Sequence, residues 1–313
     1  MIVTVTLNPA LHVGYRMRRL DLHADNDISQ VSHWIGGQGL AIARVLQEFG
    51  HEVLAAGLAG GATGELIRTE LARAGVPSRF TSIGRESRRV IDVRDGDGGL
   101  TRFAEPAPYI TTEELGRFAA DYRGLLAGAV AVVLSGSLAA GLPPESYGTL
   151  ATYAAEAGVP AVIDAGGTPL RQALSRQPAL VIPDPAAVPV PSGTVPAFAG
   201  ADGAGQALPG EPGGPGPAAL VAAGVGAVVT TAGGQVQVVT RDGEWRAAAP
   251  ADAARPGARE ALVAGLVPGL VLGWSWPDRL RHAVALAASA LPGGDVDLEA
   301  YERLLPTVPV SGP

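Results

Sequence analysis

The chain has 313 residues, of which 47% are hydrophobic and 17% charged, so it is long and apolar enough to bury one large core. A net charge of −7 gives no basic surface for a nucleic-acid backbone, and we exclude nucleic acid as a partner. The sequence contains no cysteine, which excludes disulfides and thiolate metal sites, and all 23 basic side chains are arginine.

No segment of the sequence has the pattern of a targeting or membrane-spanning segment. The N-terminal residues 1–8 lack a charged region followed by a long apolar run and are typical of a buried first strand. The apolar stretch 261–272 is interrupted by Pro268 and is too short to cross a bilayer. We therefore expect a cytoplasmic protein with no membrane partner.

Short apolar runs alternate with longer segments of helical periodicity along most of the chain. This alternation predicts βαβ units and a mostly parallel sheet. The expected buried strands are Ile2–Leu7, Glu52–Leu58, Ala129–Ser135, Ala161–Asp164, Ala179–Ile182 and Ala227–Thr231. The expected helices are Gly39–Phe49, Gly64–Ala74, Thr112–Leu126, Pro144–Ala157, Thr168–Ser175, Glu260–Val271 and Trp276–Leu291, and Thr111 to Glu114 form a capped helix start.

Two regions interrupt this alternation. The segments 15–33 and 88–103 are short, alternating and punctuated by turns, which is typical of antiparallel strands, and we assign a lid to residues 12–34 and 86–106. Glycine and proline make up about half of residues 189–217, a composition that predicts a mobile surface loop.

An ordered series of motifs extends over most of the chain. It comprises Thr6-Leu7-Asn8-Pro9-Ala10-Leu11-His12, Gly36-Gly37-Gln38-Gly39-Leu40-Ala41-Ile42-Ala43-Arg44, Gly60-Gly61-Ala62-Thr63-Gly64, Glu86-Ser87-Arg88, Leu134-Ser135-Gly136-Ser137-Leu138 and Asp164-Ala165-Gly166-Gly167. The series resembles the PfkB carbohydrate kinases, in the branch of 1-phosphofructokinase and tagatose-6-phosphate kinase. The resemblance implies one ribokinase-like domain over residues 1–313, a three-layer α/β/α sandwich with a small β-sheet lid, and a ligand cleft at the carboxyl ends of the strands.

The resemblance places a sugar or sugar phosphate under the lid. The residues that it aligns with sugar contacts are His12, Gly36, Gly37, Gln38, Ala41, Arg88 and Ser137. Three of these differ from the family pattern, because His12 replaces an aspartate, Gln38 a lysine and Ala41 an asparagine. A neutral His12 accepts only one hydrogen bond where a carboxylate accepts several, and we expect the changes at Gln38 and Ala41 to weaken sugar binding. His12 is alternatively a histidine at the edge of the core or facing solvent, and Arg88 is either a phosphate contact or a solvated charge of the lid.

The resemblance implies ATP and Mg²⁺ as cofactors of an active enzyme. Asp184, Thr231, Gly233 and Gly234 align with nucleotide-side positions, and we assign no residue as a direct metal ligand. The lysine and the glutamate of the family's magnesium motif are replaced here by Ile182 and Ala187. Asp184 either holds a metal-bound water or is a turn residue before proline.

The largest departure lies at Gly257, Ala258, Arg259 and Glu260, which align with the family's Gly-Ala-Gly-Asp anion hole. Arg259 replaces the second glycine. A residue with a side chain rarely adopts positive φ and keeps a ligand away from the backbone, so we expect this change to remove both features from the anion hole. Glu260 replaces the aspartate base, and its extra methylene moves the carboxylate. Arg259 is expected to pair with Glu260 or to contact a phosphate, and the alternative is that both form a solvated helix cap.

These replacements lead to three hypotheses. The first is a 1-phosphofructokinase-like homologue whose phosphotransfer is weak or lost, a pseudokinase that retains ligand or partner binding. The second is an active sugar or sugar-phosphate kinase that uses Glu260 as base, with Arg88 and Arg259 on phosphates. The third is a structural or regulatory subunit that binds no nucleotide. In each case the resemblance implies a homodimer formed through the lid.

Overall fold

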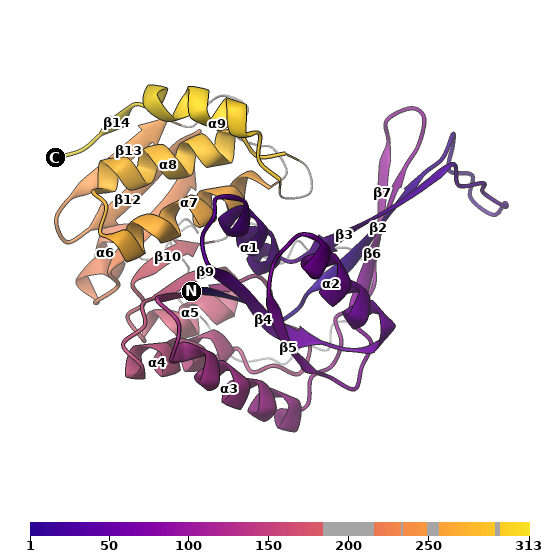
Figure 1. Ribbon diagram of the computed structural model, residues 1–313, viewed down its shortest axis with the longest axis horizontal. Helices are drawn as coiled ribbons and strands as arrows, with labels where there is room; N and C mark the ends of the chain where they lie inside the picture. The colour runs from indigo at the N-terminus through magenta and orange to yellow at the C-terminus, as the bar shows by residue number, and fades with distance from the viewer. Residues whose placement is uncertain (184–215, 233, 249–256, 292–294) are drawn as a thin grey trace.

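The computed structural model describes residues 1–183, 216–232, 234–248, 257–291 and 295–313. Two sheets organise these residues (Figure 1). The large sheet has the order β14-β13-β12-β11-β10-β9-β8-β1-β4-β5, and a small sheet has the order β3-β2-β6-β7. The predicted Pro/Gly-rich loop at 189–217 falls outside the described residues except for Gly216 and Pro217, which begin a short helix.

The middle of the large sheet is parallel, as the alternating sequence pattern predicts. Its parallel strands are β1 (Ile2–Thr6), β4 (Val53–Ala59), β5 (Ser78–Ser82), β8 (Ala131–Ser135), β9 (Ala161–Ala165), β10 (Leu180–Pro183) and β11 (Ala227–Ala232). Antiparallel strands β12 (Gln235–Thr240), β13 (Glu244–Ala248) and β14 (Val310–Ser311) complete one edge. Central strands such as β1 are buried throughout, because helices cover both faces.

Two layers of helices form the two halves of the core. One layer contains α1 (Gln38–Glu48), α2 (Gly61–Arg73), α7 (Ala258–Leu272), α8 (Trp276–Ala288) and α9 (Leu298–Leu304). The other contains α3 (Thr112–Leu126), α4 (Ser146–Glu156), α5 (Gly167–Leu174) and α6 (Pro217–Ala222). These layers on either face of the sheet confirm the predicted α/β/α sandwich (Figure 1).

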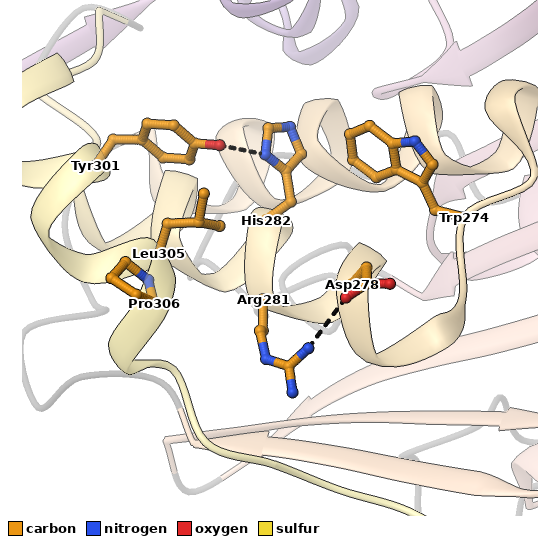
Figure 2. A pocket seen from close by; sticks show the side chains of 7 residues that line it. All are labelled: Trp274, Asp278, Arg281, His282, Tyr301, Leu305 and Pro306. Carbon is orange, nitrogen blue, oxygen red and sulfur yellow. Dashed lines mark hydrogen bonds and ion pairs between the residues drawn. The ribbon is translucent and has the colours of Figure 1, made fainter.

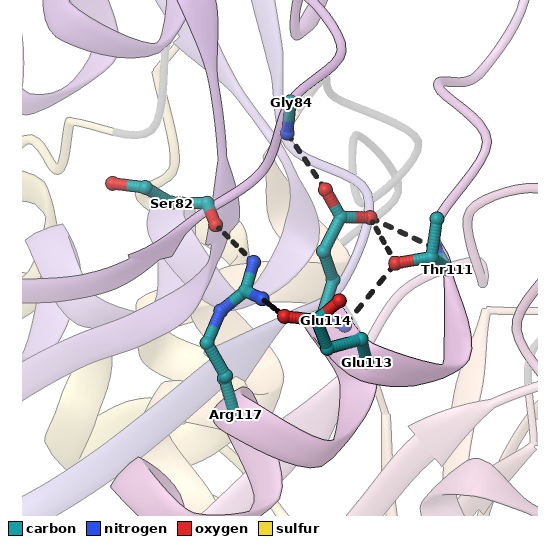
Figure 3. Close-up of polar contacts among 6 residues, drawn as sticks. All are labelled: Ser82, Gly84, Thr111, Glu113, Glu114 and Arg117. Atoms are coloured by element: carbon teal, nitrogen blue, oxygen red, sulfur yellow. Dashed lines mark hydrogen bonds and ion pairs between the residues drawn. The ribbon is translucent and has the colours of Figure 1, made fainter.

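The start of α3 has the geometry that its sequence predicts. Thr111 Oγ1 accepts from the Glu114 amide, and the Glu114 carboxylate accepts from the Thr111 amide at 2.8 Å (Figure 3). The other carboxylate oxygen accepts from the Gly84 amide at 2.7 Å. These backbone donors lower the pKa of Glu114, although its burial opposes them. The capping box therefore also ties α3 to the loop that follows β5.

The small sheet consists of β2 (Ala10–Arg16), β3 (Gln30–Gly36), β6 (Arg88–Arg94) and β7 (Leu100–Ala104). The β2–β3 and β6–β7 pairs are antiparallel as predicted, but β2 and β6 pair in parallel. One face carries Leu11, Val13 and Ile35, which share a core with residues of α1 and α2. The other face carries His12, which is directly opposite Trp34 on β3 and Val90 on β6.

Candidate functional site

The centre of the candidate site is the edge where β9 and β10 end and α7 begins. Gly257 has φ of 89°, in the left-handed region, and is the N-cap of α7. The first intrahelical bond joins the Ala261 amide to the Gly257 carbonyl at 2.9 Å. The amides of Ala258 and Arg259 therefore have no acceptor within the helix, and the helix dipole favours an anion at this end.

The conformation of Arg259 corrects one expectation. Arg259 lies within the first turn of α7 and has no positive φ, whereas Gly257 does. The replacement of glycine at position 259 therefore costs no backbone strain in this chain. The replacement instead adds a long charged side chain, which extends from α7 toward the ends of the neighbouring strands.

The Arg259 guanidinium forms a buried ion pair with Asp164. Its Nη2 lies 2.5 Å from Asp164 Oδ1 and donates to the Ile182 carbonyl at 3.0 Å. Asp164 ends β9 with no exposed side-chain surface, whereas the Arg259 side chain is 20% exposed. Arg259 is therefore not part of a solvated cap, because it pairs with a carboxylate that the sheet places across the site, and its expected pairing with Glu260 stays a prediction.

Ser135 and Tyr147 extend this network into the core. Ser135 Oγ donates to Asp164 Oδ2 at 2.6 Å, so both carboxylate oxygens of Asp164 are engaged. The Tyr147 hydroxyl donates to the carbonyls of Ser135 and Gly136 at 3.1 and 2.9 Å. Burial, with a further contribution from the charge of Asp164, raises the pKa of Tyr147, which is therefore neutral. The network fixes α7 relative to β8, β9 and β10.

The glycine-rich segment that precedes α1 forms a second wall. Gly37 is the N-cap of α1 with φ of 134°, and Gln38 is the first residue of that helix. A Cβ placed on Gly136 would lie 3.5 Å from Gln38 Oε1, which puts Gln38 beside the end of β8. Asn8 Nδ2 donates to Ser137 Oγ at 3.1 Å at the same end. The predicted residues Gln38 and Ser137 thus both lie beside the carboxyl end of β8, and Ala41 lies half-buried on α1.

His12 on β2 is held in place by a buried carboxylate. His12 Nδ1 lies 3.3 Å from Asp92 Oδ2, and the imidazole stacks on Trp34 with ring centroids 5.2 Å apart. Burial lowers the pKa of His12, although Asp92 opposes this shift, so the ring is neutral at pH 7. His12 therefore does not face solvent but is a fixed neutral group at the edge of the core, on one face of the small sheet, and its role as a sugar contact stays a prediction.

Gly36 is required by the position of this imidazole. A Cβ on Gly36 would lie 2.3 Å from His12 Nε2. We expect Gly36→Ala to lower the free energy of unfolding by about 1–3 kcal/mol, because the ring and the added methyl cannot both fit. In the His12→Ala background the same change should cost less than about 0.5 kcal/mol. Urea unfolding of the four proteins measures the difference, and equal costs in both backgrounds would contradict the packing argument.

Arg88 at the start of β6 is half-buried. Its side chain makes no hydrogen bond or ion pair with the residues that the structure describes, and its Nε is buried without a partner. Burial lowers the pKa of its guanidinium. Arg88 pairs in register with Ala10, two residues from His12, and thus shares a face of the small sheet with it. The structure places an unused cation beside His12.

The predicted nucleotide-side residues are only partly described. Thr231 is exposed near the end of β11, and Gly234, with φ of 73°, lies in the turn between β11 and β12. Asp184 and Gly233 lie outside the described residues. Thr231 and Gly234 therefore lie together, and among the described residues neither makes a hydrogen bond or ion pair with the Arg259 network.

A separate hollow of about 520 Å³ lies on the layer that contains α8 and α9, and no sequence signal indicated it. Figure 2 shows the residues that line it, which are Trp274, Asp278, Arg281, His282, Tyr301, Leu305 and Pro306. His282 Nδ1 lies 2.6 Å from the Tyr301 hydroxyl, and Trp274 contacts the imidazole edge to face. Burial, with a small contribution from His51, lowers the pKa of His282 to about 4.

The buried His282 predicts a loss of stability in mild acid. In the unfolded chain a histidine titrates near pH 6.5, so between about pH 6.5 and 4 the unfolded state takes up a proton that the folded state does not. We expect the free energy of unfolding to fall by about 2–3 kcal/mol over this range. His282→Gln should remove that part of the pH dependence. Urea unfolding of both proteins at several pH values measures it, and parallel profiles would refute the assignment.

The helix N-terminus, the charged edge of the parallel sheet and the adjoining small sheet define a ribokinase-like α/β protein. The family model for pfkB family carbohydrate kinases matches residues 11–185, more than half of the 313 residues, and the chain belongs to this family. The expectation from the sequence motifs is thus confirmed at the level of the family.

Solved structures agree with this assignment in fold. A protein described as a "possible 1-phosphofructokinase" from Thermotoga maritima is 24% identical, with a TM-score of 0.79, and the match covers 100% of this chain and 99% of that one. Phosphofructokinase-2 from Escherichia coli is 21% identical, with a TM-score of 0.81, and the match covers 98% of each chain. In the part of the chain that the structure describes, no helix is long and apolar enough to cross a membrane.

PfkB kinases use ATP and Mg²⁺, and the residues at the β9 edge do not fit a divalent cation. Mg²⁺ prefers carboxylate oxygens that are free to bind it. Arg259 and Ser135 engage both oxygens of Asp164. Outside the undescribed segments, no group of three histidine, aspartate or glutamate side chains could hold a metal. We therefore derive no step through a metal ion at this edge.

Sequence reasoning missed Asp164, Ser135 and Asp92 as members of the site. A signal existed for the first two, because Ser135 and Asp164 end two expected strands and the ends of parallel strands meet at one edge. No signal linked Asp92 to His12, since their contact depends on the parallel register of β2 and β6.

Proposed function

We propose that this member of the PfkB family is a 1-phosphofructokinase-like pseudokinase. It binds a phosphorylated ligand and ATP, and its phosphotransfer is weak or lost. The observation that supports this proposal is the Arg259–Asp164 ion pair, which occupies the edge where the family's anion hole meets the sheet. The replacement of the family's aspartate base by Glu260 also supports the proposal. A catalytic carboxylate that is displaced by about 1 Å can lower the rate roughly a hundredfold.

ADP formation from ATP tests the proposal. The assay contains Mg²⁺ and, in separate reactions, fructose 1-phosphate, tagatose 6-phosphate or fructose 6-phosphate. The last is the ligand in one solved structure of the Escherichia coli relative. We expect the parent protein to form no more ADP than Glu260→Gln. Turnover that disappears in Glu260→Gln would instead establish a kinase with an unusual base.

The active-kinase alternative is favoured by one observation, the unused guanidinium of Arg88. In that alternative Arg88 binds the phosphate of the acceptor, and the Glu260 carboxylate takes the proton of the attacking hydroxyl. Arg88→Gln would then raise KM for a sugar phosphate but leave KM for an unphosphorylated sugar unchanged. Arg259 is not available in the same way, because it is paired with Asp164.

We also propose that the chain forms a homodimer through the small sheet. Val31, Leu100 and Phe103 on strands β3 and β7 are 52%, 47% and 51% exposed. These strands are the two edges of the sheet, and exposed edges with apolar side chains favour pairing. The inhibited form of the Escherichia coli relative is a tetramer, which supports association in this fold. Analytical ultracentrifugation of the parent and of Phe103→Asp tests the dimer.

A further inference from the structure

The Arg259–Asp164 pair changes the charge of the site as well as its shape. A carboxylate with no exposed surface at the end of β9 would ordinarily repel a phosphate or require a metal ion between the two. Here the protein itself supplies the positive charge, because Arg259 Nη2 lies 2.5 Å from the Oδ1 atom of that carboxylate. A phosphate that approaches α7 therefore meets a neutralised carboxylate.

We infer that Arg259 is a built-in substitute for a metal ion, so that this site binds the phosphates of a nucleotide without a divalent cation. A divalent cation at Asp164 would have to displace the guanidinium from Oδ1 and compete with Ser135 for Oδ2. Such a displacement would also place the charge of Arg259 next to the metal. The inference depends on the nucleotide binding proposed above, and goes beyond it in naming the metal-free form as the ligand.

The donors that remain at this edge suit a phosphate. Arg259 uses Nη2 for Asp164 and Ile182, whereas Nη1 makes no hydrogen bond within the described ranges and is the donor left for a ligand, since Nε is fully buried. The side chain is one-fifth exposed, so solvent reaches it. Arginine donors in a planar fork and the amides of Ala258 and Arg259 at a helix N-terminus are both groups that bind phosphate oxygens.

Isothermal titration calorimetry of the full chain with ATP tests the inference, once in EDTA and once in excess Mg²⁺. For the parent protein we expect the two dissociation constants to agree within about threefold, since no metal contributes to binding. In the Asp164→Asn/Arg259→Gln double variant we expect metal-free binding to weaken roughly tenfold or more. This variant removes both charges and leaves no unpaired buried ion. The Asp278→Asn/Arg281→Gln double variant removes both charges of an ion pair on α8, outside the site, and serves as the matched control.

Each outcome has a defined meaning. Binding by the parent protein only in Mg²⁺ would overturn the inference and leave the proposed nucleotide binding intact. Metal-free binding that is unchanged in the double variant would also overturn it, because Arg259 would not contribute. An absence of ATP binding in both media would overturn the proposed nucleotide binding together with the inference. The comparison in EDTA and Mg²⁺ uses the unaltered protein, so it remains decisive if a variant fails to fold.

Discussion

Arg259→Ala is expected to lower the free energy of unfolding by about 3–5 kcal/mol, because it removes the cation next to a buried carboxylate. Asp164 has no exposed side-chain surface, and Arg259 Nη2 lies 2.5 Å from its Oδ1. The penalty of leaving the charge of Asp164 buried exceeds the loss of the hydrogen bonds themselves. Urea unfolding at pH 7 measures this cost.

A double-mutant cycle separates the ion pair from general packing. Asp164→Asn in the Arg259→Ala background should recover much of the lost stability, because the buried charge is then absent. Breaking the exposed Arg281–Asp278 pair by Arg281→Ala is the control, with an expected cost of less than about 1 kcal/mol. If the costs of the changes at positions 164 and 259 simply add, the two residues do not act as a pair.

Most of the large sheet could be predicted because its strands are buried on both faces. The six expected strands and seven expected helices all occur, with boundaries that shift by at most three residues. The strands at the two sides of the large sheet, which are β5 on one side and β12, β13 and β14 on the other, were missed, as were the short helices α6 and α9. They are short or have one face in solvent, so their sequences lack a sustained apolar period. Burial, more than intrinsic propensity, determined which elements could be recognised.

The location of the candidate site could be predicted from the sequence, but its side-chain contacts could be predicted only in part. Motif order located Gly257 and its helix, and the positive φ of Gly257 agrees with its role as a turn. The partner of Arg259 could not be predicted, because Asp164 is 95 residues away and the contact depends on where the sheet places β9. For the same reason His12 was interpreted without Asp92, which is 80 residues away on β6. Long-range contacts determine which charged groups surround both side chains.

Asp92→Ala is expected to lower the free energy of unfolding by about 2–3 kcal/mol, because it removes three hydrogen bonds to a buried carboxylate. The Asp92 side chain is 3% exposed. It accepts from Arg102 Nε at 2.6 Å and Nη2 at 3.1 Å, and from His12 at 3.3 Å. Its loss leaves His12 without the group that fixes the ring. We therefore expect faster amide exchange in β2 and β6 as well as lower stability.

The pH dependence of this effect follows from the pKa of Asp92. Burial alone would raise that pKa, but the hydrogen bonds from Arg102 and His12 outweigh burial and lower it. The stabilisation is therefore fully present above the pKa of an unfolded aspartate, about 3.9, and is lost as the pH falls through the folded value. Asp97→Ala, in the exposed turn between β6 and β7, is the control and should change neither stability nor exchange. If Asp92→Ala and Asp97→Ala behave alike, the carboxylate of Asp92 does not hold the small sheet together, and the fixed orientation of His12 must come from its stacking on Trp34.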